Sequence, residues 1–223
     1  MNSRAAHIAR PRASGAILPA AFYARETETV ARELLGCVLE CRTCGGFASG
    51  RIVETEAYLG EHDPACHAAV GRTKRTDPLY GPPGTAYVYF IYGSHWCFNA
   101  VTRPMGLPSA VLIRSIEPLQ GLDLMRQRRP ATRRDEDLAN GPGKLCAALD
   151  VGERHNRLAL QGPPLVIREG QGVPDASVVV TPRIGIRVAR DWPLRWCEKG
   201  SPHLSRTPPH LRQSKPALSR SFD

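Results

Sequence analysis

Two glutamates spaced two residues apart are the first feature of the sequence that could do chemistry. Glu54 and Glu56 lie in R-I-V-E-T-E-A-Y, residues 51–58, a stretch that otherwise has the composition of a strand. Residues two apart in a strand share a face, and their Cα atoms would be about 7 Å apart. Carboxylates at such distances serve glycoside hydrolysis, in which one protonates the leaving group and the other activates water. The same spacing also occurs on many solvated strands, so the pair alone leaves both interpretations open.

Aromatic residues gather around one expected hairpin turn, and Tyr92 is placed at its tip, directly before Gly93. An exposed aromatic beside basic surface can stack on a nucleic-acid base or insert between base pairs. The alternatives are a hydrophobic core for most of the cluster and a hairpin tip without function for Tyr92. The other members of the cluster are Tyr80, Tyr87, Tyr89, Phe90, Trp96 and Phe98.

Three polar residues stand where the surrounding sequence is apolar or lacks a regular pattern. Arg114 interrupts S-A-V-L-I-R-S-I, and Asn99 interrupts W-C-F-N-A-V-T. If Arg114 is buried, its guanidinium needs a partner such as a carboxylate; otherwise it faces solvent. His67 follows a segment without periodicity and could contact a substrate ring, although single histidines are more often structural.

Charge and cysteine content limit the class of protein. The formal net charge is +9, and most of the excess lies in residues 1–20 and 201–223. Basic termini can hold a polyanion without reading its sequence. No apolar run is long enough for a membrane span, and the first residues do not resemble a secretory signal, so we expect a cytoplasmic protein. Seven cysteines without such a signal argue against a disulfide framework. Cys37, Cys41 and Cys44 are interpreted as a hairpin with incidental thiols rather than a zinc site.

The expected elements alternate between short helices and hairpins. Periodicity predicts a helix from residue 26 that ends at Gly36, and then a hairpin over residues 37–58 with a Gly-Gly turn. Strands are expected at 85–91, 96–102 and 109–117, and Pro118 is predicted to begin a helix. A short helix follows Asn140, and further strands are expected at residues 164–168 and 177–186. Residues 60–84 show no convincing element. This order indicates a mixed α/β domain dominated by antiparallel hairpins.

Several blocks of sequence, taken together and in order, closely resemble the alkyladenine (3-methyladenine) DNA glycosylase family, in its bacterial type. The blocks are R-I-V-E-T-E-A-Y-L-G, A-C-H, G-R-T-K-R-T, G-P-P-G-T-A-Y-V-Y-F-I-Y-G, C-F-N-A-V-T, V-L-I-R-S-I-E-P-L, N-G-P-G-K-L-C-A-A-L, R-I-G-I and G-S-P-H-L-S. The resemblance covers roughly residues 20–205. It implies an α/β (mixed α+β) fold: a single domain on a curved, mainly antiparallel sheet, with flanking helices and a protruding β-hairpin. We therefore expect a lead at residues 1–20, a glycosylase domain at 21–205 and a basic tail at 206–223.

The resemblance implies a catalytic set for hydrolysis of an N-glycosidic bond. Glu56 would activate the attacking water, Arg114 would help to hold that water, and Ile184 would offer it a backbone carbonyl. The enzyme would release alkylated or deaminated purines, such as 3-methyladenine, 7-methylguanine and hypoxanthine, and leave an abasic site without lyase activity. Glu54 has no catalytic role in the family pattern, and we expect it to be structural and paired with an arginine.

The resemblance also implies how the damaged nucleotide would be held. Tyr58, His67 and Tyr89 would line the base pocket, Asn99 would screen the purine edge, and Tyr92 would fill the gap left in the DNA stack. Lys144, beside the free N–H groups at the start of a helix, would contact a phosphate. Ser94 stands where the family commonly has methionine.

The implied partner is double-stranded DNA with a damaged purine. The expected protein is a monomer that needs no metal or cofactor and binds no membrane, placed in the cytoplasm at the nucleoid of a prokaryote. Two alternatives stay open. One is a non-catalytic DNA-binding protein on the same fold; the other, suggested only by the glutamate pair, is a carbohydrate hydrolase.

Overall fold

The computed structural model describes residues 15–206. Residues 1–14 and 207–223, which are most of the expected terminal segments 1–20 and 206–223, therefore lie outside the described residues. Within the first of them, Ile17 forms a β-bridge with Arg168, and Leu18 is buried in the core. Among residues 15–206, no helix is long and apolar enough to cross a bilayer.

The first helices cover one face of the sheet. A short helix, α1 (Ala20–Tyr23), leads into α2 (Thr27–Glu33), and Val30 and Leu34 of this region are fully buried. The chain leaves α2 through Gly36 at φ +88°, where a Cβ would come within 2.1 Å of the Gln171 carbonyl oxygen. The predicted helix and its glycine end are confirmed, and glycine is required there because neither the φ angle nor the space suits a side chain.

Strand β2 (Gly46–Tyr58) is the centre of the sheet and carries the glutamate pair. It forms the predicted hairpin with β1 (Val38–Thr43), with Cys44 and Gly45 in the turn. Along its length β2 pairs with β5 (Ser109–Gln120), while its other edge pairs first with β1 and then with β8 (Arg195–Glu198). Every pairing in the described sheet is antiparallel, as expected for this mixed α+β single domain.

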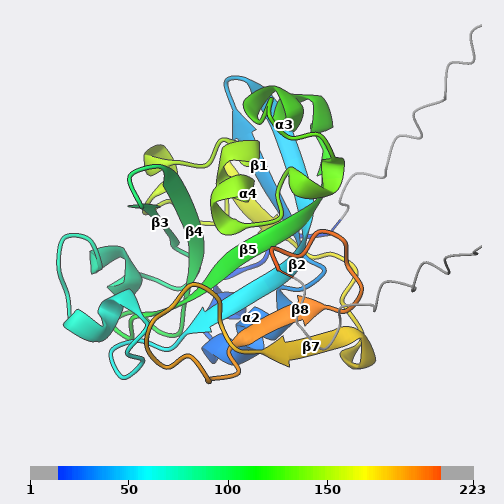
Figure 1. Ribbon diagram of the computed structural model, residues 1–223. Coiled ribbons are helices and arrows are strands. Elements are labelled where there is room, and N and C mark those ends of the chain that lie inside the picture. Colours follow the sequence, from blue (N-terminus) through cyan, green and yellow to red (C-terminus); the bar gives the residue numbers. More distant parts are fainter. Residues whose placement is uncertain (1–14, 207–223) are drawn as a thin grey trace, which may run out of the picture.

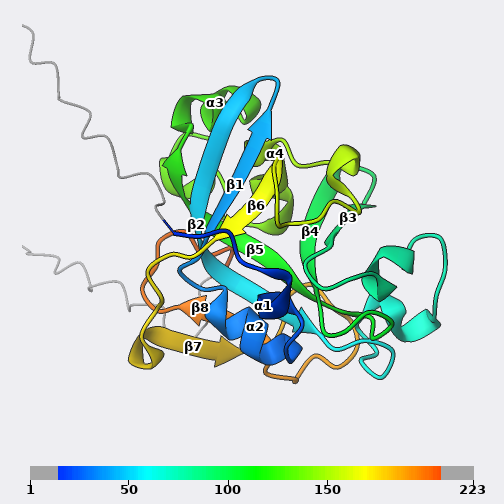
Figure 2. The ribbon, with the colours of Figure 1, turned by 180° about the vertical axis from the view of Figure 1, so that it is seen from behind.

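The sheet order is β3-β4-β5-β2-β1-β6, where β3 is Ala86–Ile91 and β4 is His95–Thr102. Strands β7 (Val178–Thr181) and β8 complete the eight strands. Strand β6 (Leu165–Arg168) pairs with β1 at the far end. Figure 1 shows helix α4 (Pro142–Leu149) in front of the sheet, and the view from behind in Figure 2 shows α1 and α2 in front. The two helical layers thus lie on opposite faces of the sheet.

Strands β3 (Ala86–Ile91) and β4 (His95–Thr102) form the predicted hairpin. Both central residues of its turn have positive φ, +55° at Tyr92 and +64° at Gly93. They are the central residues of a β-turn closed by the Ser94 N–H and the Ile91 carbonyl, within the three-residue connection 92–94. Positive φ at both positions is typical of the turns whose twist matches that of the strands. The turn leaves the Tyr92 side chain 79 % exposed, the projecting tip that the sequence indicated.

The expected helix start at Pro118 is wrong. Pro118 lies inside β5, where it pairs with Gly50 at a shift in register, and helix α3 (Leu122–Arg128) begins only after Gly121. A strand tolerates proline at such an irregularity because one ladder hydrogen bond is already lost there. The long strand predicted over 177–186 also ends earlier, at Thr181. No element was predicted at the positions of α1 and β8. Residues 60–84 contain only two short 3₁₀ turns, His67–Val70 and Asp77–Tyr80.

Candidate active site

Glu54 and Glu56 project from the same face of β2, and both side chains are fully buried. Thr55, between them, points to the opposite face, where its hydroxyl donates to the Ala31 carbonyl of α2 at 2.8 Å. The alternation of the strand thus sends both carboxylates away from α2 and toward β5 and α4. The glutamate pair is therefore not the decoration of a solvated strand.

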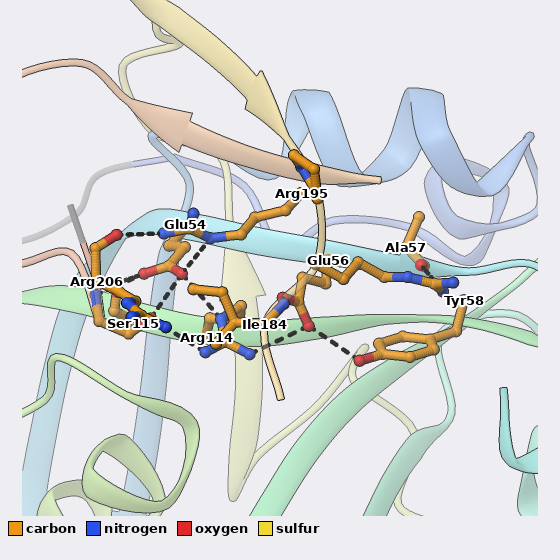
Figure 3. Close-up of polar contacts among 12 residues, drawn as sticks. Glu54, Glu56, Ala57, Tyr58, Arg114, Ser115, Ile184, Arg195 and Arg206 are labelled. Atoms are coloured by element: carbon orange, nitrogen blue, oxygen red, sulfur yellow. Dashed lines mark hydrogen bonds and ion pairs between the residues drawn. The ribbon is translucent and has the colours of Figure 1, made fainter. Parts of the chain in front are cut away.

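Glu56 is surrounded by three hydrogen-bond donors. The Tyr58 hydroxyl donates to Oε2 at 2.9 Å, Arg114 Nη1 donates to the same oxygen at 3.1 Å, and the Ile184 backbone N–H donates to Oε1 at 2.7 Å. Figure 3 shows these groups converging from three segments of chain. The structure brings together the three residues that the resemblance named as catalytic, and Ile184 contacts Glu56 through its amide.

Arg114 is buried on β5 between the two carboxylates. Its Nε donates to Glu54 Oε1 at 2.8 Å, while Nη1 reaches Glu56. Although burial opposes the charged form, the two carboxylates raise the pKa of Arg114 above its usual value. The partner expected for a buried Arg114 is thus present.

Glu54 has more donors than Glu56. Arg195 Nε on β8 donates to its Oε1 at 2.7 Å, and Ser115 and Ser205 also donate to the carboxylate. Burial raises the pKa of Glu54, but the charges of Arg114 and Arg195 and the Ser205 hydrogen bonds outweigh it and lower the pKa below 4.5. The expectation that Glu54 pairs with an arginine is confirmed, and it pairs with two.

Behind Tyr58 lies a second buried ion pair that the sequence did not indicate. Arg183 Nη2 donates to Asp63 Oδ1 at 2.8 Å, Nη1 donates to the other carboxylate oxygen, and both side chains have no exposed surface. The guanidinium lies over the Tyr58 ring, 4.7 Å from its centroid. The only sequence signal was the position of Arg183 as the first residue of the R-I-G-I block, next to Ile184.

Most predicted site residues line one cavity of about 460 Å³, lying between the β3–β4 hairpin, the start of α4 and the loop after β7. Glu56 itself is buried against the wall, in contact with three lining residues. Lys144 is outside the lining, and its Nζ donates to Asn140 Oδ1 at 2.7 Å, whereas its neighbours Pro142 and Gly143 do line the cavity. The predicted residues in the lining are Tyr58, His67, Tyr89, Tyr92, Asn99, Arg114 and Ile184.

One wall of the cavity is a packed group of aromatic rings. The ring centroids of His67 and Tyr89 are 4.5 Å apart in an edge-to-face arrangement, and those of Tyr87 and Tyr89 are 5.2 Å apart. His67 Nδ1 and the Tyr87 hydroxyl form a hydrogen bond at 2.9 Å. Burial, with the nearby Arg75 charge, lowers the pKa of His67 to about 4, so the imidazole is neutral at pH 7. Tyr87 belonged to the aromatic cluster of the sequence but had no expected role.

Asn99 lies on the floor of the same cavity. Its side chain is 4 % exposed, and Nδ2 donates to the Tyr87 carbonyl at 3.2 Å. This bond fixes the orientation of the amide across the β3–β4 pair. The buried polar position that the apolar sequence around Asn99 suggested is thus confirmed, and one side of the amide is committed to the backbone.

The thiols show no arrangement typical of a metal centre. Within residues 15–206, no three His, Cys, Asp or Glu side chains are placed to hold a metal ion together. Cys37 and Cys41 are buried, and burial raises the pKa of each to about 11. Cys44 is exposed in the hairpin turn, so the three thiols lie in different surroundings.

Comparison with known proteins gives the site its context. The sequence profile of the family described as "Methylpurine-DNA glycosylase (MPG)" matches residues 21–202. A protein of Myxococcus xanthus named "Putative 3-methyladenine DNA glycosylase" is 50 % identical over 203 residues, covering 90 % of this chain and 98 % of that protein. A protein of the same name from Methanoculleus marisnigri is 49 % identical over 192 residues, covering 85 % of this chain and 98 % of that protein.

A third relative of that name, from Carboxydothermus hydrogenoformans, is 44 % identical over 191 residues, with 85 % of this chain and 99 % of that protein covered. The matched region contains the whole of the cavity lining and both buried glutamates. The resemblance drawn from the motifs is thus confirmed: the chain belongs to the methylpurine-DNA glycosylase family, whose members are DNA-repair hydrolases.

Proposed function

We propose that the protein flips an alkylated or deaminated purine out of duplex DNA and hydrolyses its N-glycosidic bond with a water activated by Glu56. The observation that carries this proposal is the placement of Glu56, a buried carboxylate held by Tyr58, Arg114 and Ile184 against an aromatic cavity. A nucleobase must leave the stack before any such cavity can receive it, and a damaged pair costs least to open.

Glu56 has the capacity to accept a proton from water. A carboxylate offers about four lone-pair positions, and the three protein donors occupy three of them. The fourth can orient a water toward the anomeric carbon. As the oxygen of that water bonds to the carbon, its proton passes to Glu56, and the electron pair of the C–N bond leaves with the base. The products are the free base and an abasic deoxyribose.

The aromatic wall suits a cationic leaving group. Alkylated purines such as 3-methyladenine carry positive charge, and electron-rich rings attract a cation by about 1–2 kcal/mol when water is excluded. A charged base already leaves readily, so the protein needs chiefly to place water and to stabilise a cationic sugar. Tyr58, His67 and Tyr89 supply the walls, and Asn99 supplies a fixed amide at the purine edge.

The cavity favours hydrolysis by water over attack by an amine. Among the described residues, the cavity lining includes no lysine, and Lys144 is engaged with Asn140. An abasic product without strand cleavage is therefore the expected outcome. Tyr92, exposed at the hairpin tip beside the cavity, would fill the space vacated in the duplex.

The test uses duplex oligonucleotides that carry a single hypoxanthine or a single ethenoadenine. Wild-type protein should release the free base and leave a site that breaks only after alkali. Glu56→Gln should lower the single-turnover rate by roughly a hundredfold or more, because general-base catalysis contributes 10²–10⁴-fold. Glu153→Gln, at an exposed glutamate outside the cavity, is the matched control and should leave the rate unchanged. Full activity in Glu56→Gln would refute the assignment, and duplex binding without base release by the wild type would indicate a non-catalytic DNA-binding protein.

A further inference from the structure

Glu54 accepts more hydrogen bonds than its assumed structural role requires. Five donors reach its carboxylate: Arg114 Nε at 2.8 Å, Arg195 Nε at 2.7 Å, Ser115 Oγ at 3.1 Å, and the backbone N–H and hydroxyl of Ser205 at 2.6 and 2.7 Å. An ion pair that served only to join β2 to β5 would need no donor to Glu54 besides Arg114. Ser115 also lies on β5, whereas Arg195 comes from β8 and Ser205 from the segment that follows β8.

That segment, residues 200–206, is here named the C-terminal strap. It turns away from β8 at Gly200, which has φ +78°, and brings Leu204 and Ser205 back into contact with β2. Leu204 is 6 % exposed and packs with Val53 and Cys197 in a small apolar cluster. The strap therefore has its own anchor in the core, and the next residue, Ser205, is delivered directly to Glu54.

The strap closes a ring of contacts around Arg114. Arg114 Nη2 donates to Ser205 Oγ at 3.1 Å, and the same hydroxyl donates to Glu54 Oε1. Arg195 Nη2 donates to the Arg206 carbonyl at 2.6 Å, which ties the far end of the strap to the same group, as Figure 3 shows. Within the described residues, two carboxylates and two guanidiniums thus share one buried network.

This ring determines which nitrogen of Arg114 can reach Glu56. Nε is held by Glu54 and Nη2 by Ser205, so Nη1 is the nitrogen that donates to Glu56. A guanidinium without these restraints favours the two-pronged grip on a carboxylate. Such a grip on Glu56 would occupy the acceptor position that a water needs.

We propose that Glu54 is a positioning residue which, with Ser205 of the C-terminal strap, holds Arg114 in a single-contact geometry on Glu56. This inference rests on the proposed function. The active site is complete only when residues 200–206 are docked, although no strap residue lines the cavity. The proposal gives the family's last motif, G-S-P-H-L-S, a role in catalysis through Arg114.

The first test measures single-turnover base release and duplex affinity in Ser205→Ala and Ser205→Thr. Ser205→Ala removes the hydroxyl that joins Arg114 to Glu54 but keeps the hydrogen bond from the backbone N–H to Glu54. It should lower the rate on the order of tenfold, as the loss of one charge-assisted hydrogen bond implies. The Kd for the duplex should stay within about twofold, because Ser205 lies outside the cavity lining. Ser205→Thr restores the hydroxyl and should restore most of the rate. Equal rates in wild type and Ser205→Ala would overturn the proposal.

Glu54→Gln supplies a stronger perturbation. The amide replaces one acceptor oxygen of Glu54 by an NH₂ donor. In one orientation this donor faces the Ser205 N–H, and in the other it faces the two arginines. Because two donors repel each other, either the strap or Arg114 must move. We expect the single-turnover rate of base release to be at least tenfold lower than in Ser205→Ala. Glu198→Gln is the matched control, because Glu198 on β8 accepts from Arg51 of β2 at 2.6 Å at the same strand junction but does not touch Arg114. If Glu198→Gln slows base release as much as Glu54→Gln, the effect is structural and the proposal fails. If Glu54→Gln does not fold, the Ser205 pair of variants decides the question.

A spectroscopic measurement is independent of activity. The ¹⁵N-bound proton of Arg114 Nε, assigned by its loss in Arg114→Lys, should be protected from exchange in the wild type. It should exchange faster in Ser205→Ala and recover in Ser205→Thr; unchanged exchange in Ser205→Ala would overturn the proposal. If the wild type releases no base from either duplex, the proposed function fails, whereas this signal still reports whether the strap holds Arg114.

Discussion

Arg183 and Tyr58 form a stacked pair beneath the cavity: the guanidinium carbon lies 4.7 Å from the centroid of the tyrosine ring. The residue that follows Arg183, Ile184, donates its N–H to Glu56, and the Tyr58 hydroxyl donates to the same carboxylate. Two of the contacts of Glu56, those from Ile184 and Tyr58, therefore depend on one loop. That loop is fixed by Arg183, whose Nη1 also donates to the Ala57 carbonyl at 3.0 Å.

Asp63→Asn should destabilise the fold strongly. It leaves the fully buried Arg183 guanidinium without its bidentate acceptor, and breaking one side of a buried ion pair costs about 3–5 kcal/mol. Urea unfolding at pH 7 measures the effect. Asp77→Asn is the control, because Asp77 pairs with Arg72 and Arg157 near the surface, where pairs contribute about 0–1 kcal/mol. Equal losses in the two variants would contradict the interpretation of Asp63 as the anchor of the loop.

Tyr92→Ser should weaken base flipping and leave the cavity intact. The side chain is exposed at a tight turn, and stacking of an aromatic on a base contributes about 1–3 kcal/mol. We expect single-turnover base release from duplex DNA to fall roughly tenfold. Met105→Ser removes another exposed apolar side chain, outside the cavity lining, and should have no such effect. An unchanged rate in Tyr92→Ser would refute the proposal that Tyr92 fills the space vacated in the duplex.

His67 should contribute to the pH dependence of stability. Its pKa is about 4 in the folded protein and 6.5 when unfolded, so the unfolded chain binds the extra proton between these values. The contribution of neutral His67 is complete above pH 6.5 and is lost as the pH falls toward 4. His67→Gln should therefore lose less stability over this window than the wild type, by roughly 1–3 kcal/mol. Urea unfolding at several pH values measures the difference, and equal losses of stability in the two proteins would contradict the prediction.

Gly143→Ala should displace the β3–β4 hairpin. A Cβ at residue 143 would lie 3.0 Å from Cβ and Cγ of His95, which is tighter than nine in ten contacts of real Cβ atoms, so His95 must shift by a few tenths of an ångström. Overpacking of this kind costs about 1–3 kcal/mol when the neighbours cannot move, and here it would also shift the base of the hairpin that carries Tyr92. We expect weaker duplex binding, measured by fluorescence anisotropy. Gly152→Ala, where the nearest atom of Trp96 is 3.6 Å away, is the comparison, and equal affinities in the two variants would contradict the prediction.

Most of the local structure followed from the sequence. Helix α2 and its glycine end, the β1–β2 and β3–β4 hairpins, and helix α4 depend on short-range rules: apolar periodicity, turn residues and a Pro-Gly helix start. The same rules failed where a distant partner decided the outcome. Pro118 stays in β5 because β2 carries a register shift opposite it, and β8 exists because the second half of β2 has an edge that β1 leaves free.

The sequence alone determined the family, because its motifs can be compared directly, and it named most of the residues that line one cavity. It could not separate the surroundings of Glu54 from those of Glu56, since both lie on one face of one strand. The tertiary structure separates them through segments distant in the chain: β5 supplies Arg114 to both, the loop after β7 supplies Ile184 to Glu56, and β8 and the C-terminal strap supply Arg195 and Ser205 to Glu54. A buried charge is defined by its partners, and those partners are chosen by long-range packing rather than by local sequence.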